Sequence, residues 1–285
     1  MERFRLLNAL GVGGAGRVVL VEDLLRPGSR LALKELFEAG ADDVAALHRE
    51  FATLATLRHP NLIEVFELHV DAETGRSQFT MEHVDGDNIV ATVRREGPGS
   101  LVPLAAETLR ALAFLHDFGL VHRDLKPGNI LVRRSAKAGH RVVVLDFGLA
   151  VTRRADPLAV SPAMAGTLSY IAPELFDGAA PTKRSDLYSF GALIYEAVHG
   201  KAPYILKGSD VAGFVDAVRD GRRARPKLPT GFPAALARWI DDLLSPDPAD
   251  RPLSALDALA RLNEACKTKE PLETKDDRAA RLGSG

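Results

Sequence analysis

The nine residues from Val121 to Asn129, Val-His-Arg-Asp-Leu-Lys-Pro-Gly-Asn, constrain this chain more than any other stretch. They place one carboxylate, one ammonium group and one carboxamide within six residues, at Asp124, Lys126 and Asn129. Such a segment can accept a proton from a hydroxyl group, neutralise a phosphate and bind a divalent metal ion. Alone, the stretch only suggests a reaction centre, so its meaning depends on what surrounds it.

Composition sets the outer limits. The chain has 285 residues, a formal net charge of −1 and 46% hydrophobic residues. This length allows one large domain or two lobes around a cleft, and the hydrophobic content excludes a wholly disordered chain. The charge balance gives no sign of a nucleic-acid or anionic-membrane partner. The single cysteine, Cys266, excludes an internal disulfide and a cysteine-based zinc site. Without an apolar run of about 18 residues or a signal pattern, we expect a cytoplasmic protein or fragment with no membrane segment.

Three glycines, Gly11, Gly13 and Gly16, separate the apolar-rich segment Phe4–Leu10 from the β-branched run Arg17–Val21. Because a second strand is predicted after the glycines, the pattern favours a hairpin tip over the glycine turn of a dinucleotide-binding fold. Glycines lack a Cβ, so the backbone N–H groups of such a tip can approach phosphates closely. An ordinary glycine-rich turn remains the alternative.

A lysine on a strand and a glutamate on a helix form a second candidate pair. Leu31–Lys34 alternates as a strand does, with the lysine at its end. The apolar residues of Ala41–Leu57 recur at three- and four-residue spacing, which predicts a helix with Glu50 near its inward face. A solvated edge lysine and a surface glutamate are the simpler interpretations.

An acidic residue follows a second buried-type strand. Arg141–Leu145 ends in Asp146-Phe147-Gly148. A carboxylate at a strand end suits a metal ligand that reaches into a cleft. Asp146 follows Asn129 by seventeen residues, which leaves room for one strand and a turn. For an isolated tripeptide, a structural aspartate would be the better interpretation.

Taken together, these motifs resemble the eukaryotic-like (Hanks-type) serine/threonine protein kinase family of the bacterial type. The order of the glycine-rich loop, strand lysine, H-R-D-L-x-x-x-N, D-F-G and A-P-E motifs matches the family, over roughly residues 3–262. The resemblance implies an α+β, bilobal fold. A small antiparallel-sheet lobe with one main helix (1–84) would join a larger, mainly helical lobe (87–262) through a hinge at 82–86. We expect residues 263–285 to be a charged, flexible tail or linker.

The resemblance implies that ATP binds between the lobes with Mg²⁺, for which Mn²⁺ could substitute. Met81 would be the gatekeeper beside the adenine, and the backbone of Glu82 and Val84 would bind the adenine edge. The other implied ATP contacts are Gly11, Gly13, Gly16, Val18, Ala32, Lys34 and Leu131.

The implied reaction is transfer of the γ-phosphoryl group of ATP to a Ser or Thr hydroxyl, with autophosphorylation expected. Asp124 would orient the hydroxyl and accept its proton, and Lys126 would stabilise the transferred group. Thr167 would hydrogen-bond both residues. Lys126 and Thr167 are features of the Ser/Thr class rather than the Tyr class.

Two further pairs would hold the nucleotide. Lys34 would pair with Glu50 and point at the α- and β-phosphates, and Asn129 and Asp146 would bind the metal ion.

Five more residues carry structural or regulatory roles in the resemblance. Arg123 would pair with a phosphate on the segment after D-F-G, for which Ser161 is the candidate, although a loop that needs no phosphate is equally open. Glu174 would pair with Arg251. Asp186 would hold the backbone of the catalytic loop, which is the segment Val121–Asn129, or stabilise a helix N-terminus.

A pseudokinase, which binds nucleotide and regulates a partner, is the main alternative. The complete catalytic set argues against it. A small-molecule phosphotransferase would usually lack the docking segment Thr167–Glu174 and the Arg251 partner, and both are present. The expected partners are protein substrates carrying Ser or Thr and a fused or separate signalling domain. The sequence leaves the substrate and the oligomeric state open.

Overall fold

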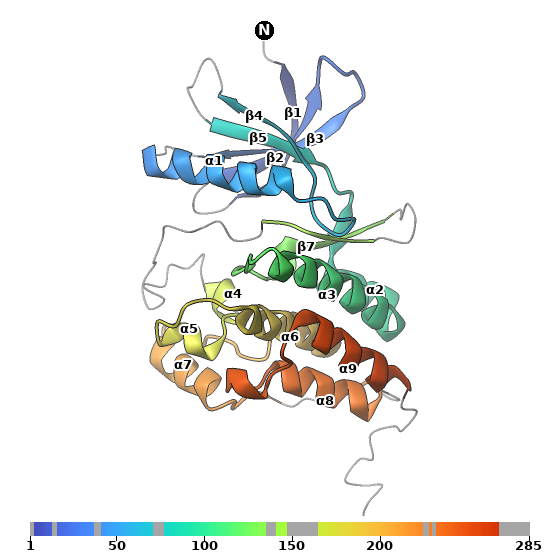
Figure 1. Ribbon diagram of the computed structural model, residues 1–285, viewed down its shortest axis with the longest axis vertical. Helices are drawn as coiled ribbons and strands as arrows, with labels where there is room; N and C mark the ends of the chain where they lie inside the picture. Colours follow the sequence, from blue (N-terminus) through green and yellow to red (C-terminus); the bar gives the residue numbers. More distant parts are fainter. Residues whose placement is uncertain are drawn as a thin grey trace, which may run out of the picture.

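The computed structural model describes residues 3–12, 16–36, 41–70, 77–134, 141–146, 165–224, 228–229 and 232–267. These residues form two lobes, a sheet with one helix above and a larger set of helices below (Figure 1). The predicted bilobal α+β architecture is therefore confirmed.

The small lobe is built on a five-stranded sheet in the order β1-β2-β3-β5-β4, in which every neighbouring pair is antiparallel. Its strands are β1 (Phe4–Val12), β2 (Gly16–Asp23), β3 (Arg30–Leu36), β4 (Val65–Val70) and β5 (Ser77–Glu82). Because β2 pairs with β1 directly after the glycines, the segment is a hairpin, as predicted. The dinucleotide-binding alternative would have required a helix there.

One helix, α1 (Ala41–Thr56), covers a face of this sheet. Leu47 and Leu54 are buried, and the ring of Phe51 lies 5.8 Å from that of Phe79 on β5. The apolar spacing that predicted the helix thus supplies its contact with the sheet.

A second sheet lies where the lobes meet. It has the order β6-β7-β8, from β6 (Gly86–Asn88), β7 (Ile130–Arg133) and β8 (Val142–Val144). Gly86 is required where β6 lies beside β7, because a Cβ at that position would lie 2.1 Å from the carbonyl oxygen of Val132. Asp146 follows this sheet closely, so the sheet positions it.

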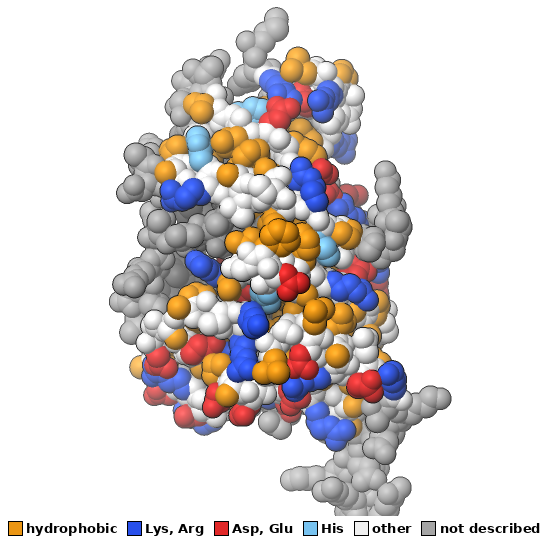
Figure 2. All heavy atoms as spheres, in the orientation of Figure 1, with side chains coloured by type: hydrophobic (Ala, Val, Ile, Leu, Met, Phe, Trp, Pro, Cys, Tyr) orange, Lys and Arg blue, Asp and Glu red, His pale blue; other side chains and the backbone are white. Residues whose placement is uncertain are grey.

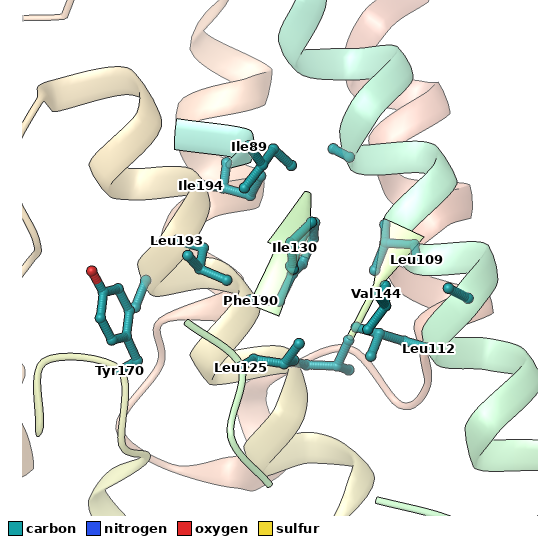
Figure 3. Packing of buried hydrophobic residues seen from close by; sticks show 14 of the residues in the cluster. Ile89, Leu109, Leu112, Leu125, Ile130, Val144, Tyr170, Phe190, Leu193 and Ile194 are labelled. Carbon is teal, nitrogen blue, oxygen red and sulfur yellow. The ribbon is translucent and has the colours of Figure 1, made fainter. Parts of the chain in front are cut away.

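The large lobe packs around a buried central helix, α6. Its helices are α2 (Ile89–Glu96), α3 (Leu101–Asp117), α4 (Ala165–Leu168), α5 (Pro173–Phe176), α6 (Lys183–His199), α7 (Val211–Arg219), α8 (Ala234–Leu243) and α9 (Ala255–Lys267). Side chains from α2, α3, α6 and the second sheet form one core, which also includes Leu125 of the segment Val121–Asn129 (Figure 3). The buried side chains labelled there include Ile89, Leu109, Leu112, Ile130, Val144, Phe190 and Ile194.

Helices α8 and α9 are joined through a buried tryptophan. Trp239 is buried, and its indole N–H donates to the carbonyl oxygen of Ala258 at 2.9 Å, so it is a core residue. Helix α9 extends to Lys267, the last residue that the structure describes.

The surface of the described residues shows no single dominant charge in the view of Figure 2. Lys and Arg side chains are interspersed with Asp and Glu over the large lobe on that face. None of the helices in the described part of the chain is long and apolar enough to cross a membrane.

Candidate active site

Asp186, in the N-terminal half of α6, supports the catalytic loop from beneath. Its Oδ2 accepts a hydrogen bond from the backbone N–H of His122 at 2.7 Å, and its Oδ1 accepts one from the N–H of Arg123 at 2.9 Å. The Nε2 of His116 lies 2.9 Å from Oδ2. Asp186 is 1% exposed, and these three partners satisfy its buried carboxylate. The contact expected between Asp186 and the loop backbone is present in the structure.

Arg123 has a left-handed backbone conformation with φ of 70°. A non-glycine residue in such a conformation costs on the order of 1–3 kcal/mol and persists only where its surroundings enforce it. Here the bond from its N–H to Asp186 helps to enforce it.

His122 connects the catalytic loop to the strand that leads to Asp146. It is fully buried, its Nε2 lies 2.9 Å from the carbonyl oxygen of Leu145, and its Nδ1 accepts from the N–H of Asp124 at 3.3 Å. The carbonyl can only accept, so the proton is on Nε2. Burial lowers the pKa of His122, which keeps the ring neutral near pH 7.

Asp124, Lys126 and Asn129 form one hydrogen-bonded cluster. The Lys126 Nζ is 2.6 Å from Asp124 Oδ2, and the Asn129 Nδ2 is 3.0 Å from the same oxygen and 2.7 Å from the Asp124 carbonyl oxygen. A 3₁₀ turn, Pro127–Asn129, brings the carboxamide back onto the aspartate. Among the described residues, no protein donor contacts Asp124 Oδ1 or Asn129 Oδ1. One carboxylate oxygen and one amide oxygen are therefore available to ligands.

Asp146 faces the small lobe from just beyond β8. Its Oδ1 is 2.9 Å from the Nζ of Lys34 on β3, so one ion pair crosses between the lobes. Burial tends to raise the pKa of Asp146, but the Lys34 ammonium, with smaller contributions from His122 and Lys126, outweighs it, and the net pKa is lowered. The carboxylate is thus ionised at neutral pH, as a metal ligand must be.

The adenine-binding residues expected from the sequence come from both lobes. Ala32 on β3 lies opposite Met81 on β5 in the strand register, and both are buried. The N–H of Glu82 already donates to the Glu64 carbonyl oxygen at 2.9 Å, so it is not free for the adenine edge. The N–H of Val84 donates to no protein acceptor in the described part of the chain. Val84 is therefore the better backbone donor for a ligand.

The other expected contacts are half-buried or only partly described. Val18 and Leu131 are partly buried against the main core. Gly11 is the second-last residue of β1, which ends at Val12, and Gly16 begins β2.

Several predicted groups lie outside the described residues. These are Gly13, Ser161 and the side chain of Glu50, although the Glu50 backbone is part of α1. The pairs Lys34–Glu50 and Arg123–Ser161 phosphate therefore stay predictions.

Thr167, in α4, makes neither of its expected contacts. In the described residues no hydrogen bond joins its hydroxyl to Asp124 or Lys126. Lys126 contacts Asp124 instead, and the Thr167 carbonyl accepts from the N–H of Tyr170 at 3.1 Å. A role for Thr167 beside the catalytic pair stays a prediction.

Arg251 and Glu174 form the expected pair, 77 residues apart in sequence. The two bonds are parallel, Nη1 to Oε1 at 2.7 Å and Nη2 to Oε2 at 2.8 Å. Arg251 is 1% exposed, and its other donors bind the carbonyl oxygens of Ser245, Pro246 and Arg184. The pair ties the end of the docking segment to the loop before α9.

Sequence reasoning missed His116 and the partly buried pair of Tyr170 and Glu196. The Tyr170 hydroxyl donates to Glu196 Oε2 at 2.5 Å, and burial raises the Tyr170 pKa strongly. The only signal for His116 was a polar residue at the end of an apolar helical run. Nothing local marked Glu196.

The comparisons with known proteins agree with this geometry. A family model described as "Protein kinase domain" matches residues 4–261, and the chain belongs to this family. It is 33% identical to the serine/threonine-protein kinase PknA of Mycobacterium tuberculosis, over 95% of this chain and 64% of that protein. It is 34% identical to the serine/threonine-protein kinase pkn2 of Myxococcus xanthus, over 94% of this chain and 33% of that protein.

A third relative and a solved structure complete the comparison. The DNA damage-responsive serine/threonine-protein kinase RqkA of Deinococcus radiodurans is 35% identical over 91% of this chain and 39% of that protein. The crystal structure of Rad53 1-466 in complex with AMP-PNP has a TM-score of 0.70 at 24% identity, and covers 91% of this chain and 65% of its own. It shows the fold. The chain spans less than two thirds of the length of these relatives.

Proposed function

We propose that this chain is an ATP-dependent serine/threonine protein kinase. It transfers the γ-phosphoryl group of ATP to Ser or Thr hydroxyls of protein substrates, including its own. The observation that carries the proposal is the cluster of Asp124, Lys126 and Asn129. Among the described residues, this cluster leaves one oxygen of the aspartate and one of the asparagine without protein donors. The names of the relatives, all serine/threonine-protein kinases, support it.

The donor atoms in the cleft fit Mg²⁺, with Mn²⁺ as a substitute. Asn129 Nδ2 is committed to Asp124, so only its Oδ1 can bind a cation, and the lowered pKa of Asp146 keeps that carboxylate ionised. Carboxylate and amide oxygens are the ligands that these hard cations prefer. When bound, the metal ion would neutralise charge on the ATP phosphates.

The remaining chemistry belongs to the side chains of the loop. Asp124 Oδ1 accepts a hydrogen bond from the substrate hydroxyl, orients it, and takes its proton as the phosphoryl group is transferred. Lys126, already beside Asp124, contributes positive charge near the transferred group. Lys34 positions the α- and β-phosphates from the small lobe. Most of the rate enhancement in such a reaction comes from positioning and charge neutralisation.

The setting of the reaction is part of the proposal. We place it in the cytoplasm, where ATP is available, with protein substrates as the partners and a fused or separate signalling domain as the source of regulation.

A transfer assay tests the proposal. The purified chain is incubated with γ-labelled ATP and Mg²⁺ beside the variants Lys34→Met and Asp146→Asn, and labelled residues are mapped. We expect phosphate on Ser or Thr with the wild type and none with either variant. If the wild type clearly binds ATP but transfers no phosphate, the proposed kinase activity is refuted and the pseudokinase hypothesis is favoured.

A further inference from the structure

Glu107, on α3, is a buried carboxylate that the mechanism above does not use. It is 7% exposed. Its Oε2 accepts three hydrogen bonds, from the side chain of Asn61 at 2.9 Å and from the backbone N–H groups of Arg141 and Val142 at 2.8 Å each. A single oxygen thus joins three segments that are distant in sequence. A buried carboxylate is stable only with such partners, so the contacts are strongly coupled.

Asn61 strengthens the connection from the other side. It is 1% exposed, and its Nδ2 also donates to the carbonyl oxygen of Val142 at 2.9 Å. Its own carbonyl oxygen accepts from the N–H of Val144 at 2.9 Å, and the N–H of Ile63 donates to the Val144 carbonyl oxygen at 3.1 Å. Residues 61–63, which belong to the link between α1 and β4, therefore form an isolated parallel β-bridge with β8, in which Leu62 pairs with Val144.

The strand held in this way leads directly to Asp146. At its far end, the N–H of Leu145 donates to the Asn129 carbonyl oxygen at 2.9 Å, and the Leu145 carbonyl oxygen contacts His122. Glu107 fixes the first residues of β8, and the catalytic loop fixes the last. The position of the Asp146 carboxylate depends on both.

We propose that Glu107 is a positioning residue, which fixes β8 against the link 61–63 and thereby places Asp146 for metal binding. The proposal rests on the kinase function proposed above. Because 61–63 follows α1 of the small lobe and Glu107 belongs to α3 of the large lobe, the same carboxylate also couples the two lobes. Loss of its acceptor oxygen displaces Asp146 without removing any group from the reaction centre.

Three variants separate this role from general stability. Glu107→Leu has a similar size and no acceptor, so the three hydrogen bonds to Oε2 are lost, while Asn61 keeps its bond to the Val142 carbonyl oxygen. Glu107→Gln keeps an acceptor oxygen at the same reach. Thr108→Val is the matched control, because Thr108 is the next residue on α3 and is fully buried. Within the described part of the chain, its hydroxyl donates only to the Leu104 carbonyl oxygen of its own helix.

Two readouts are measured for each variant at a temperature where it is folded. The first is amide hydrogen exchange of peptides that cover 59–63 and 141–146. The second is the Mg²⁺ concentration that gives half-maximal transfer. For Glu107→Leu we expect faster exchange in both segments, by about ten- to one-hundred-fold, the range for losing hydrogen bonds to a charged group. We also expect a raised Mg²⁺ requirement. Glu107→Gln restores both readouts toward the wild type, and Thr108→Val leaves both unchanged.

Opposite results would overturn the proposal. If Glu107→Leu lowers thermal stability but keeps wild-type exchange and the wild-type Mg²⁺ requirement, Glu107 is only structural. If Glu107→Leu does not fold, Asn61→Ala replaces it, since it leaves Glu107 its two backbone donors. In that variant exchange should be faster at 59–63, which loses its side-chain bond to Glu107, than at 141–146, where Glu107 still accepts from Arg141 and Val142. An equal increase in both segments would mean that Glu107 does not hold β8 and would refute the role. If the wild type transfers no phosphate, the kinase function fails, while the exchange data still decide whether Glu107 orders β8.

Discussion

Replacement of Arg251 by methionine should destabilise the large lobe severely. The variant keeps most of the aliphatic volume but removes a guanidinium group that is 1% exposed. It leaves the Glu174 carboxylate without its partner and removes the donors to three carbonyl oxygens, those of Ser245, Pro246 and Arg184. Removal of one partner of a buried ion pair costs about 3–5 kcal/mol. With about 2–4 °C per kcal/mol for a large domain, the melting temperature should fall by roughly 6–20 °C.

The chain offers a matched control for this measurement. Arg219 also pairs with an aspartate, Asp177, but the two side chains are 41% and 57% exposed. An exposed pair contributes at most about 1 kcal/mol, so Arg219→Met should change the free energy of unfolding by less than that. Both variants are compared with the wild type by denaturant unfolding and by thermal melting.

A double-mutant cycle with Glu174→Gln isolates the pair itself. The coupling between positions 251 and 174 should exceed about 1 kcal/mol, because the residues share two bonds in a buried site. If Arg251→Met costs no more than Arg219→Met, or if the cycle shows no coupling, then burial and geometry do not determine the strength of this ion pair.

Three other outcomes are expected. Asp124→Asn should reduce phosphoryl transfer by about 10²- to 10⁴-fold, the contribution of a positioned base, while ATP binding stays within experimental error; an equal loss of nucleotide affinity would contradict the role of the base. Burial lowers the pKa of His122 below its ordinary value of 6.5. As the pH falls below about 6.5, His122 therefore binds a proton in the unfolded chain more readily than in the folded chain. The free energy of unfolding should therefore decrease with acidification, by at most about 1.4 kcal/mol per pH unit from this residue, and His122→Gln should flatten the curve measured between pH 5 and 7.5. Phosphate on Ser161 should raise activity through Arg123, and Ser161→Ala with the wild-type rate of autophosphorylation would show that this switch is absent.

The parts of the fold that were predictable from the sequence are those with a local signal. The hairpin β1–β2 was marked by glycines between two apolar runs, and α1 was marked by its three- and four-residue spacing. Helices α2 and α7 were not predicted. Both are short, with eight and nine residues, so the capping residues Asn88 and Asp210 are followed by too few turns for a clear helical periodicity.

The long-range contacts of the site had no local signal at all. Glu174 and Arg251 are 77 residues apart, and their pairing was expected only from the family resemblance. Glu107 was missed because α3 is buried on nearly all sides, so no polar face distinguishes a structural carboxylate from a surface one. Tertiary packing, rather than periodicity, decides what such a residue contacts.

The site as a whole is held by its backbone rather than by its reactive groups. Arg123 and Asp146 both have left-handed backbone conformations, with φ of 70° and 44°, and each costs on the order of 1–3 kcal/mol. At Arg123, the backbone N–H groups of His122 and Arg123 donate to the buried carboxylate of Asp186. Next to Asp146, the N–H of Leu145 donates to the Asn129 carbonyl oxygen, and the Leu145 carbonyl oxygen contacts His122.

Each bond to the charged carboxylate contributes about 1.5–3 kcal/mol, which is enough to offset the strain at Arg123. These contacts fix the main chain, and the bonds of Lys126 and of the Asn129 amide nitrogen to Asp124 fix the side chains of the loop. Among the described residues, this arrangement leaves Asp124 one carboxylate oxygen for the proposed bond to a substrate hydroxyl, and leaves Asn129 its amide oxygen for the proposed metal ion.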